Sequence, residues 1–304
     1  MSNLIPPYLT KGDSIGIVCP SGYMAEERIL NCIQTLRSWG FRVKVGKTVG
    51  GNSVNYFSGT DSERLEDLQG MFDDPDIRAV LFGRGGYGLS RIIDQISLKK
   101  FRKSPKWIMG YSDICLLHSY IYSNEEIVTA HSPMAGAFQD YGVENPYIDS
   151  IRDLLIGKPL SYSCEPHPYN RRGEAEGVLM GGNLTLLAHA IGGNAEFKTK
   201  GLILFLEDIG EYLYNIDRML HQLRSAGKFR KPAGVVIGSF TDLKDTERPF
   251  GRGAYEIIRD IFEEFDFPVC YGFPVGHVKE NLALKCGVEY LLKVGKERVS
   301  LSEV

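Results

Sequence analysis

A serine that could serve as a catalytic nucleophile follows a short apolar run at 107–110. The motif there is Gly110-Tyr111-Ser112-Asp113. A serine on a tight turn between a strand and a helix exposes its hydroxyl, and the next backbone N–H can face an oxyanion. The second glycine of the full G-x-S-x-G pattern is replaced by Ile114. A serine before Asp at a helix start is also an ordinary N-cap, and this motif alone favours the cap over the nucleophile.

A glycine-rich turn follows the predicted strand that ends at Phe82, and it reads Gly83-Arg84-Gly85-Gly86-Tyr87-Gly88. Such glycines let backbone amides approach an oxyanion, hold a phosphate at a helix N-terminus, or simply make a tight turn. The spacing is not G-x-G-x-x-G, and no acidic residue ends a strand about 20 positions further on. We therefore do not expect a dinucleotide site.

A carboxylate and an imidazole stand at two other predicted strand ends. Glu207 lies where the apolar run 202–206 stops, with Asp208 beside it, and it could orient a base, bind a cation or adjoin a helix cap. His277 ends the stretch Pro274-Val275-Gly276-His277. The chain order Ser112, Glu207, His277 recurs in hydrolases with catalytic triads.

The elements that must position these residues alternate between strands and helices in the first half. Apolar runs predict strands, and apolar residues at helical spacing predict helices. The expected strands are 14–19, 41–45, 77–82 and 107–110, and the expected helices are 25–39, 61–72, 89–96 and 113–122. Strand–helix pairs with short links indicate an α/β fold with a parallel, doubly wound sheet.

The alternation of strands and helices stops in a stretch rich in Pro, Gly and polar residues, and it resumes in the second half. We therefore expect an N-terminal α/β domain over 1–157 carrying the nucleophile, a connection over 158–176, and a C-terminal domain over 177–304 carrying Glu207 and His277. In that domain the expected strands are 177–180, 201–206, 233–237, 290–292 and 299–301, and the expected helices are 184–190, 216–226 and 255–265.

Composition limits the classes of partner. The 304 residues are natural for two domains, and the net charge of −3 gives no basic excess for nucleic acid or a membrane surface. The basic cluster 99–103 is typical of a solvated helix end. Residues 1–7 show no leader pattern, and the six cysteines are scattered without ligand spacing. We expect a cytoplasmic protein with free thiols and neither metal nor cofactor.

Several stretches together resemble the L,D-carboxypeptidases, which comprise muramoyltetrapeptide carboxypeptidases and the related microcin C immunity peptidases. The resemblance runs from about Pro7 to the C-terminus. The motifs that carry it are Gly-Arg-Gly-Gly-Tyr-Gly (83–88), Met-Gly-Tyr-Ser-Asp-Ile (109–114), His-Ser-Pro-Met (131–134), Gly-Gly-Asn-Leu (181–184), Leu-Glu-Asp-Ile-Gly-Glu (206–211), Ile-Asp-Arg-Met-Leu (216–220) and Pro-Val-Gly-His (274–277).

The resemblance implies a flavodoxin-like N-terminal domain followed by a smaller β-rich α/β domain. It also implies a cytoplasmic serine peptidase in which Ser112 is the nucleophile, Glu207 the acid and His277 the base. The oxyanion donors would be the N–H of Asp113 and an N–H from Gly85 or Gly86. A substrate with a free carboxylate favours a nearby cation, and Arg84 could supply it, although a surface arginine in a turn is an equal interpretation.

The implied reaction is hydrolysis, through an acyl-enzyme, of the bond between an L-centre and a terminal D-alanine in murein tetrapeptide. The L-centre belongs to lysine or meso-diaminopimelate, and the reaction belongs to cell-wall recycling. Family members are described as homodimers. Two alternatives remain: an immunity-type peptidase that cleaves aminoacyl-nucleotide or microcin-like conjugates, and a non-catalytic protein that binds small ligands.

Overall fold

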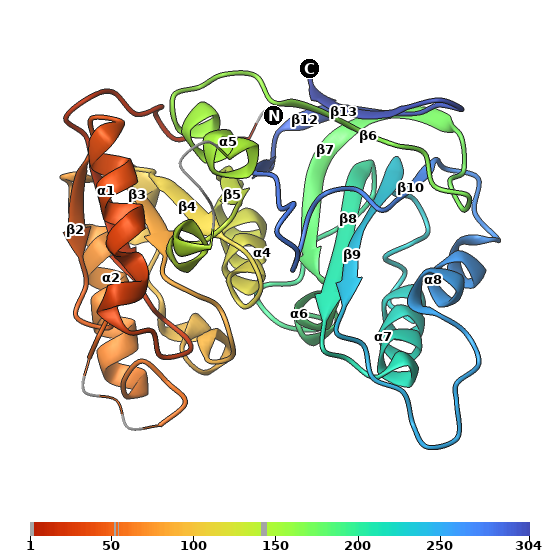
Figure 1. The fold of residues 1–304 in the computed structure, drawn as a ribbon, viewed down its shortest axis with the longest axis horizontal. Helices are drawn as coiled ribbons and strands as arrows, with labels where there is room; N and C mark the ends of the chain where they lie inside the picture. The colour runs from red at the N-terminus through yellow and green to blue at the C-terminus, as the bar shows by residue number, and fades with distance from the viewer. Residues whose placement is uncertain (1–2, 52, 54, 141–144) are drawn as a thin grey trace. The chain divides into compact units, whose positions relative to one another are not determined.

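The computed structural model describes residues 3–51, 53, 55–140 and 145–304, and the chain forms two compact units (Figure 1). Unit 1 comprises Met1–Lys158 and Leu282–Lys285, and unit 2 comprises Pro159–Asn281 and Cys286–Val304. Met1 and Ser2, which open the stretch without a leader pattern, lie outside the described residues.

Unit 1 is built on a six-stranded sheet with the order β11-β5-β4-β3-β1-β2. Its strands are β1 (Ser14–Val18), β2 (Arg42–Val45), β3 (Ile77–Phe82), β4 (Trp107–Gly110), β5 (Thr129–His131) and β11 (Leu284–Cys286). The pairs β1–β2, β1–β3, β3–β4 and β4–β5 are all parallel. The order 2-1-3-4-5 is flavodoxin-like, which confirms the fold predicted for the first half.

Helices and short 3-10 turns connect these strands. They are η1 (Glu26–Ile29), α1 (Leu30–Ser38), α2 (Asp61–Asp73), η2 (Leu89–Arg91), η3 (Ile93–Gln95), α3 (Lys99–Lys103), α4 (Ile114–Glu125), η4 (Ala135–Gln139) and α5 (Pro146–Leu155). Thr60 starts α2 with a capping box to Glu63. The helix predicted over 89–96 is wrong: two 3-10 turns stand there, because Ile92 leaves the helical region at φ −123°.

Unit 2 holds a seven-stranded mixed sheet with the order β10-β9-β8-β7-β12-β13-β6. Its strands are β6 (Ser161–Cys164), β7 (Gly173–Asn183), β8 (Leu202–Ile209), β9 (Gly234–Thr241), β10 (Val269–Tyr271), β12 (Glu289–Val294) and β13 (Val299–Glu303). Strands β7 to β10 pair in parallel, and β7, β12, β13 and β6 pair antiparallel. The helices are α6 (Leu184–His189), α7 (Leu213–Ser225) and α8 (Ala254–Phe262). The segment 158–176, expected as a connection, contains β6 and the start of β7.

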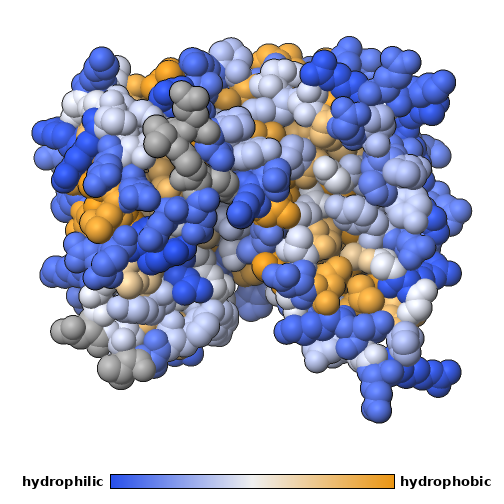
Figure 2. Space-filling view, in the orientation of Figure 1, coloured by the Kyte–Doolittle hydropathy of each residue, from blue (hydrophilic) through white to orange (hydrophobic). Residues whose placement is uncertain are grey.

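Each unit contains buried aromatic side chains that pack on a second ring. In unit 1 the fully buried Trp107 stacks on Tyr8 with ring centroids 5.6 Å apart. In unit 2 Phe229 and Phe262 meet edge to face at 4.8 Å. On the face drawn in Figure 2, hydrophilic side chains predominate and hydrophobic ones form scattered patches. Within the described part of the chain, no helix has the length and apolar character needed to cross a membrane.

Candidate active site

Ser112 lies on a left-handed turn where β4 ends and α4 begins. Its φ is +64°, a region that residues other than glycine rarely adopt. The N-cap position of α4 belongs to Asp113, one residue after Ser112. The helix-cap interpretation of Ser112 is therefore wrong. A serine held in this conformation is typical of a nucleophile elbow.

The glycine-rich turn after β3 lies directly against this serine. A Cβ placed on Gly85 would come within 2.8 Å of the Ser112 Cβ and 2.9 Å of its Oγ. Gly86 has a φ of +106°, which also favours glycine. Among the described residues, no backbone carbonyl accepts a hydrogen bond from the N–H of Gly85 or Gly86. The turn thus brings backbone amides close to Ser112, as an oxyanion site requires.

The buried carboxylate of Asp113 links three loops around Ser112. Its Oδ2 accepts hydrogen bonds from the Ser21 hydroxyl at 2.5 Å and from the Leu89 N–H at 2.9 Å. Leu89 directly follows the glycine-rich turn, and Ser21 belongs to the loop after β1. From the sequence, Asp113 was expected to contribute only its backbone N–H. No local sequence pattern predicts that its side chain forms hydrogen bonds with these loops.

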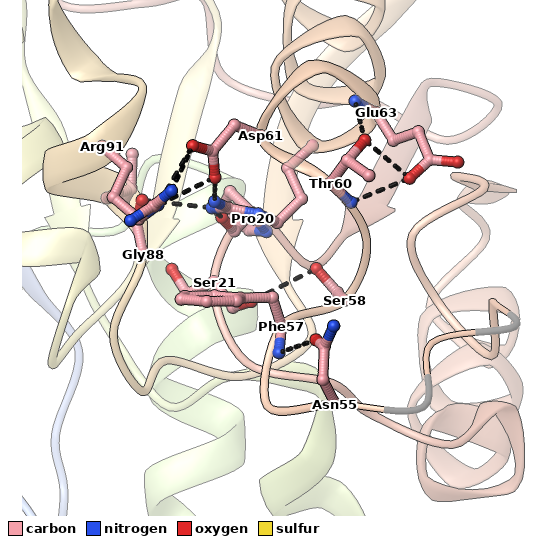
Figure 3. Close-up of polar contacts among 12 residues, drawn as sticks. Pro20, Ser21, Asn55, Phe57, Ser58, Thr60, Asp61, Glu63, Gly88 and Arg91 are labelled. Carbon is pink, nitrogen blue, oxygen red and sulfur yellow. Dashed lines mark hydrogen bonds and ion pairs between the residues drawn. The ribbon is translucent and has the colours of Figure 1, made fainter.

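Arg64 contacts two of the same loops through Pro20 and Gly88, which Figure 3 labels. This side chain is fully buried in α2 and donates to the backbone carbonyls of Pro20 and Gly88, the latter at 3.1 Å. Its charge pairs with Asp61, which also binds Arg91 through two nitrogens at 2.8–3.0 Å. Sequence analysis missed Arg64, because an arginine three residues after an aspartate looks like a solvated helix pair.

Arg84 lies in the glycine-rich turn and is exposed. Its Nη1 donates to the Tyr23 carbonyl at 2.9 Å. It lines a cavity of about 550 Å³ in unit 1 together with Tyr111, Arg28 and Met134. Arg84 directly precedes Gly85, and Tyr111 directly precedes Ser112. The cavity therefore adjoins the Ser112 turn.

Glu207 and His277 are hydrogen-bonded to each other within unit 2. The Oε2 of Glu207 lies 2.7 Å from the Nδ1 of His277, and the Glu207 side chain is fully buried. Glu207 is carried by β8, and His277 lies in the loop that follows β10. A carboxylate bound to one ring nitrogen fixes the imidazole orientation and stabilises its charged form.

Two glycines let the His277 loop approach β8 closely. A Cβ on Gly276 would come within 2.8 Å of the Glu207 Oε2, and its φ is +116°. A Cβ on Gly238 in β9 would come within 2.5 Å of the Val275 carbonyl oxygen. Glycine therefore precedes His277 in the motif because any side chain at position 276 would collide with Glu207.

Asp208 points away from His277 and fastens α6 to β8. Its carboxylate accepts hydrogen bonds from Asn183 Nδ2 at 2.9 Å and from the backbone N–H of Thr185 at 2.9 Å. The N-cap of α6 is Asn183, and Asp208 supports that helix start from the neighbouring strand. Burial, together with the charge of Glu207, raises the pKa of Asp208 to about 6.

The structure brings the predicted residues together within each unit. Ser112, Asp113 and Gly85 meet in unit 1, and Glu207 meets His277 in unit 2. Within the described ranges, no group of three or more His, Cys, Asp or Glu side chains could hold a metal ion. A serine elbow and a buried Glu–His pair are the components of a serine hydrolase.

Sequence relatives identify the family. The chain matches the LD-carboxypeptidase N-terminal domain over residues 15–132 and the LD-carboxypeptidase C-terminal domain over residues 176–292. It is 34% identical to the "Probable murein peptide carboxypeptidase" of Bacillus subtilis, covering 97% of this chain and 93% of that protein. The chain belongs to the LD-carboxypeptidase family and is a serine-type carboxypeptidase.

Two further relatives show the breadth of this family. The muramoyltetrapeptide carboxypeptidase structure from Oxalobacter formigenes matches with a TM-score of 0.86 and 27% identity, covering 95% of this chain and 98% of that one. The microcin C7 self-immunity protein of Escherichia coli is 25% identical, covering 99% of this chain and 96% of that protein. The fold and the two-domain organisation are therefore shared across both branches.

Proposed function

We propose that this protein hydrolyses the bond between an L-centre and the terminal D-alanine of murein tetrapeptide. The L-centre is that of lysine or meso-diaminopimelate. The observation that carries the proposal is the Glu207–His277 pair at 2.7 Å, in a chain that also holds Ser112 on a left-handed turn. The family of the chain and the names of its relatives support murein peptide as the substrate class.

In the proposed reaction, Ser112 and His277 share the proton transfers. The His277 Nε2 takes the Ser112 proton as Oγ attacks the carbonyl carbon, and it later gives that proton to the leaving D-alanine nitrogen. A water molecule, activated by His277 in the same way, then hydrolyses the acyl-enzyme. Glu207 keeps the proton on Nδ1 and stabilises the imidazolium that forms twice in each cycle.

Backbone amides would stabilise the charge that develops on the carbonyl oxygen. We assign this role to the N–H of Asp113 and to an N–H of Gly85 or Gly86. The close approach of Gly85 to Ser112 supports this assignment. We also propose that Arg84 binds a substrate carboxylate, through the part of its guanidinium that does not contact Tyr23.

The first test is mass spectrometry of purified protein incubated with L-Ala-γ-D-Glu-meso-diaminopimelate-D-Ala. The native chain should release D-alanine, and Ser112→Ala should release it about 10⁴-fold more slowly or not at all. Equal release by both proteins would contradict the role of Ser112. A native chain that releases none would exclude this substrate.

The second candidate is an immunity-type peptidase acting on aminoacyl-nucleotide conjugates. The similarity to the microcin C7 self-immunity protein over 99% of this chain favours testing it. The same assay, run with an aminoacyl sulfamoyl nucleoside in place of the tetrapeptide, separates the two substrates. Release of the amino acid from that conjugate alone would favour the immunity branch.

We further propose that the protein acts in the cytoplasm as a homodimer during cell-wall recycling. Six free cysteines, five of them buried, suit a reducing compartment. Cell fractionation and light scattering of the purified chain test the compartment and the assembly. A periplasmic location, or a monomer at working concentration, would contradict the corresponding part of this proposal.

A further inference from the structure

Two buried oxygen atoms in unit 2 lack a hydrogen-bond partner among the described residues. One is Oε1 of Glu207, the carboxylate oxygen that does not contact His277. The other is the hydroxyl oxygen of Ser239, which lies in β9. A buried polar atom without a partner costs free energy, and a hydrogen bond that satisfies both atoms removes both costs.

The pairing of β8 with β9 is irregular at Glu207. The register shifts there, so that Glu207 alone stands opposite two residues of β9, Gly238 and Ser239. An extra residue of this kind is typical of a β-bulge, which changes the direction of a side chain and is frequent next to active sites. The bulge accounts for a serine side chain beside the carboxylate.

The loop that carries His277 shows how close the two side chains lie. A Cβ on Gly276 would come within 2.5 Å of the Ser239 Oγ and within 2.8 Å of the Glu207 Oε2. Both oxygens therefore border the same small space, which the glycine leaves open. The Ser239 N–H donates to the Val275 carbonyl at 2.9 Å, so the backbone of β9 is held against this loop.

We propose that the Ser239 hydroxyl donates a hydrogen bond to Oε1 of Glu207, directly or through one bound water molecule, and so positions the carboxylate that orients His277. This inference rests on the proposed function, in which His277 is the base. A carboxylate held at one oxygen can still rotate, whereas a carboxylate held at both keeps the imidazole in one orientation during proton transfer. Ser239 is a positioning residue in this role, because it does not touch the reacting atoms.

A steric interpretation of Ser239 is that the position only requires a small side chain against Gly276. Alanine is smaller than serine and differs from it only in the hydroxyl. Ser239→Ala therefore satisfies the steric requirement and removes the hydrogen bond, so the two interpretations predict different results for this variant.

The first test compares the kinetics of D-alanine release. Loss of one hydrogen bond to the carboxylate should lower kcat about 10-fold in Ser239→Ala, with KM as in the native chain. Ser239→Thr keeps the hydroxyl on a residue that strands favour, so it should keep most of kcat. The matched control is Ser300→Ala, which removes a partly exposed hydroxyl from β13 and should behave as native.

The second test needs no substrate and uses scanning calorimetry of the full chain. Ser239→Ala should lower the melting temperature by about 5 °C, because a buried carboxylate loses a donor. In the Glu207→Gln background the same substitution should lower it by about half as much or less, since a hydrogen bond with a neutral amide is weaker than one with a carboxylate. The difference between the two backgrounds measures the contact between Ser239 and the Glu207 charge.

Equal losses of melting temperature in the two backgrounds, or native kcat in Ser239→Ala, would overturn the proposal. A chain that shows this coupling but releases no D-alanine would instead contradict the proposed reaction and support the hydrogen bond. Circular dichroism verifies the fold of each variant, and if Ser239→Thr does not fold as the native chain does, the comparison of the two backgrounds decides.

Discussion

At the scale of single residues, we expect the close contact between Gly85 and Ser112 to control where the Ser112 hydroxyl points. An alanine at position 85 has no φ penalty, but its Cβ would lie 2.8 Å from the Ser112 Cβ. We expect Gly85→Ala to displace the hydroxyl and to lower kcat about 100-fold or more. Steady-state kinetics of D-alanine release measure this effect.

The control for that substitution is Gly70→Ala. Gly70 lies exposed in α2, and a Cβ there meets nothing within 4 Å. Alanine should therefore leave kcat unchanged and stabilise unit 1 by about 0.5–1 kcal/mol. If Gly85→Ala kept native kcat, the glycine turn would not constrain Ser112.

Glu207 shows a conflict between activity and stability. Two neighbouring carboxylates are buried at the end of β8, and the Glu207 charge helps to raise the pKa of Asp208. Glu207→Gln keeps the side-chain shape and removes one charge. We expect kcat to fall about 10³–10⁴-fold while the melting temperature is kept or rises. The exposed Glu289→Gln is the control and should change neither. A melting temperature that falls together with kcat would instead indicate that Glu207 mainly stabilises the fold.

At the scale of elements, Arg64 connects α2 to the loops after β1 and β3. Removing this buried charge takes a donor from the Pro20 and Gly88 carbonyls and leaves Asp61 paired with Arg91 alone. We expect Arg64→Ala to destabilise unit 1 by about 3–5 kcal/mol, and the exposed Arg91→Ala to destabilise it far less. Urea unfolding followed by tryptophan fluorescence measures both, since Trp39 and Trp107 lie in unit 1. Equal losses would contradict the bracing role of Arg64.

The elements that were predictable from sequence are those long enough to show a period. The apolar strands β3 and β8 and the amphipathic α7 follow from residue patterns alone. The three-residue strand β5 carries too few residues to show any pattern. The strand β11 joins the first sheet from far along the chain, and local patterns do not report such pairing.

Some features of the candidate site were also predictable from local sequence, and others were not. The Ser112 turn was predictable because strand–Gly-x-Ser–helix is a local geometry. The pairing of Glu207 with His277 depends on a contact between residues 70 positions apart, so the sequence could supply only candidates. The Asp113 and Arg64 contacts depend on how loops pack, and residue types alone did not indicate them.

At the scale of the whole molecule, the two units respond to acid in opposite directions through their buried groups. In unit 2, Asp208 has a folded pKa of about 6, above its ordinary value of 3.8. The folded state therefore binds this proton more tightly, and the resulting stability is present at low pH and is lost as the pH rises through 6. In unit 1, the fully buried His118 has its pKa lowered by burial from 6.5 to about 4.

His118 should make unit 1 sensitive to acid. Its Nε2 lies 2.9 Å from the Gly110 carbonyl, so the neutral ring holds the end of β4 beside the Ser112 turn. Between pH 6.5 and 4 the unfolded chain binds a proton that the folded chain does not, so stability falls with pH, by about 3 kcal/mol in total. Tryptophan fluorescence reports unit 1 alone, and its melting temperature should fall over this range. His118→Gln can still donate to Gly110 but does not titrate, and its melting temperature should fall less steeply. Parallel slopes for the two proteins would show that other groups of unit 1 dominate its response to acid.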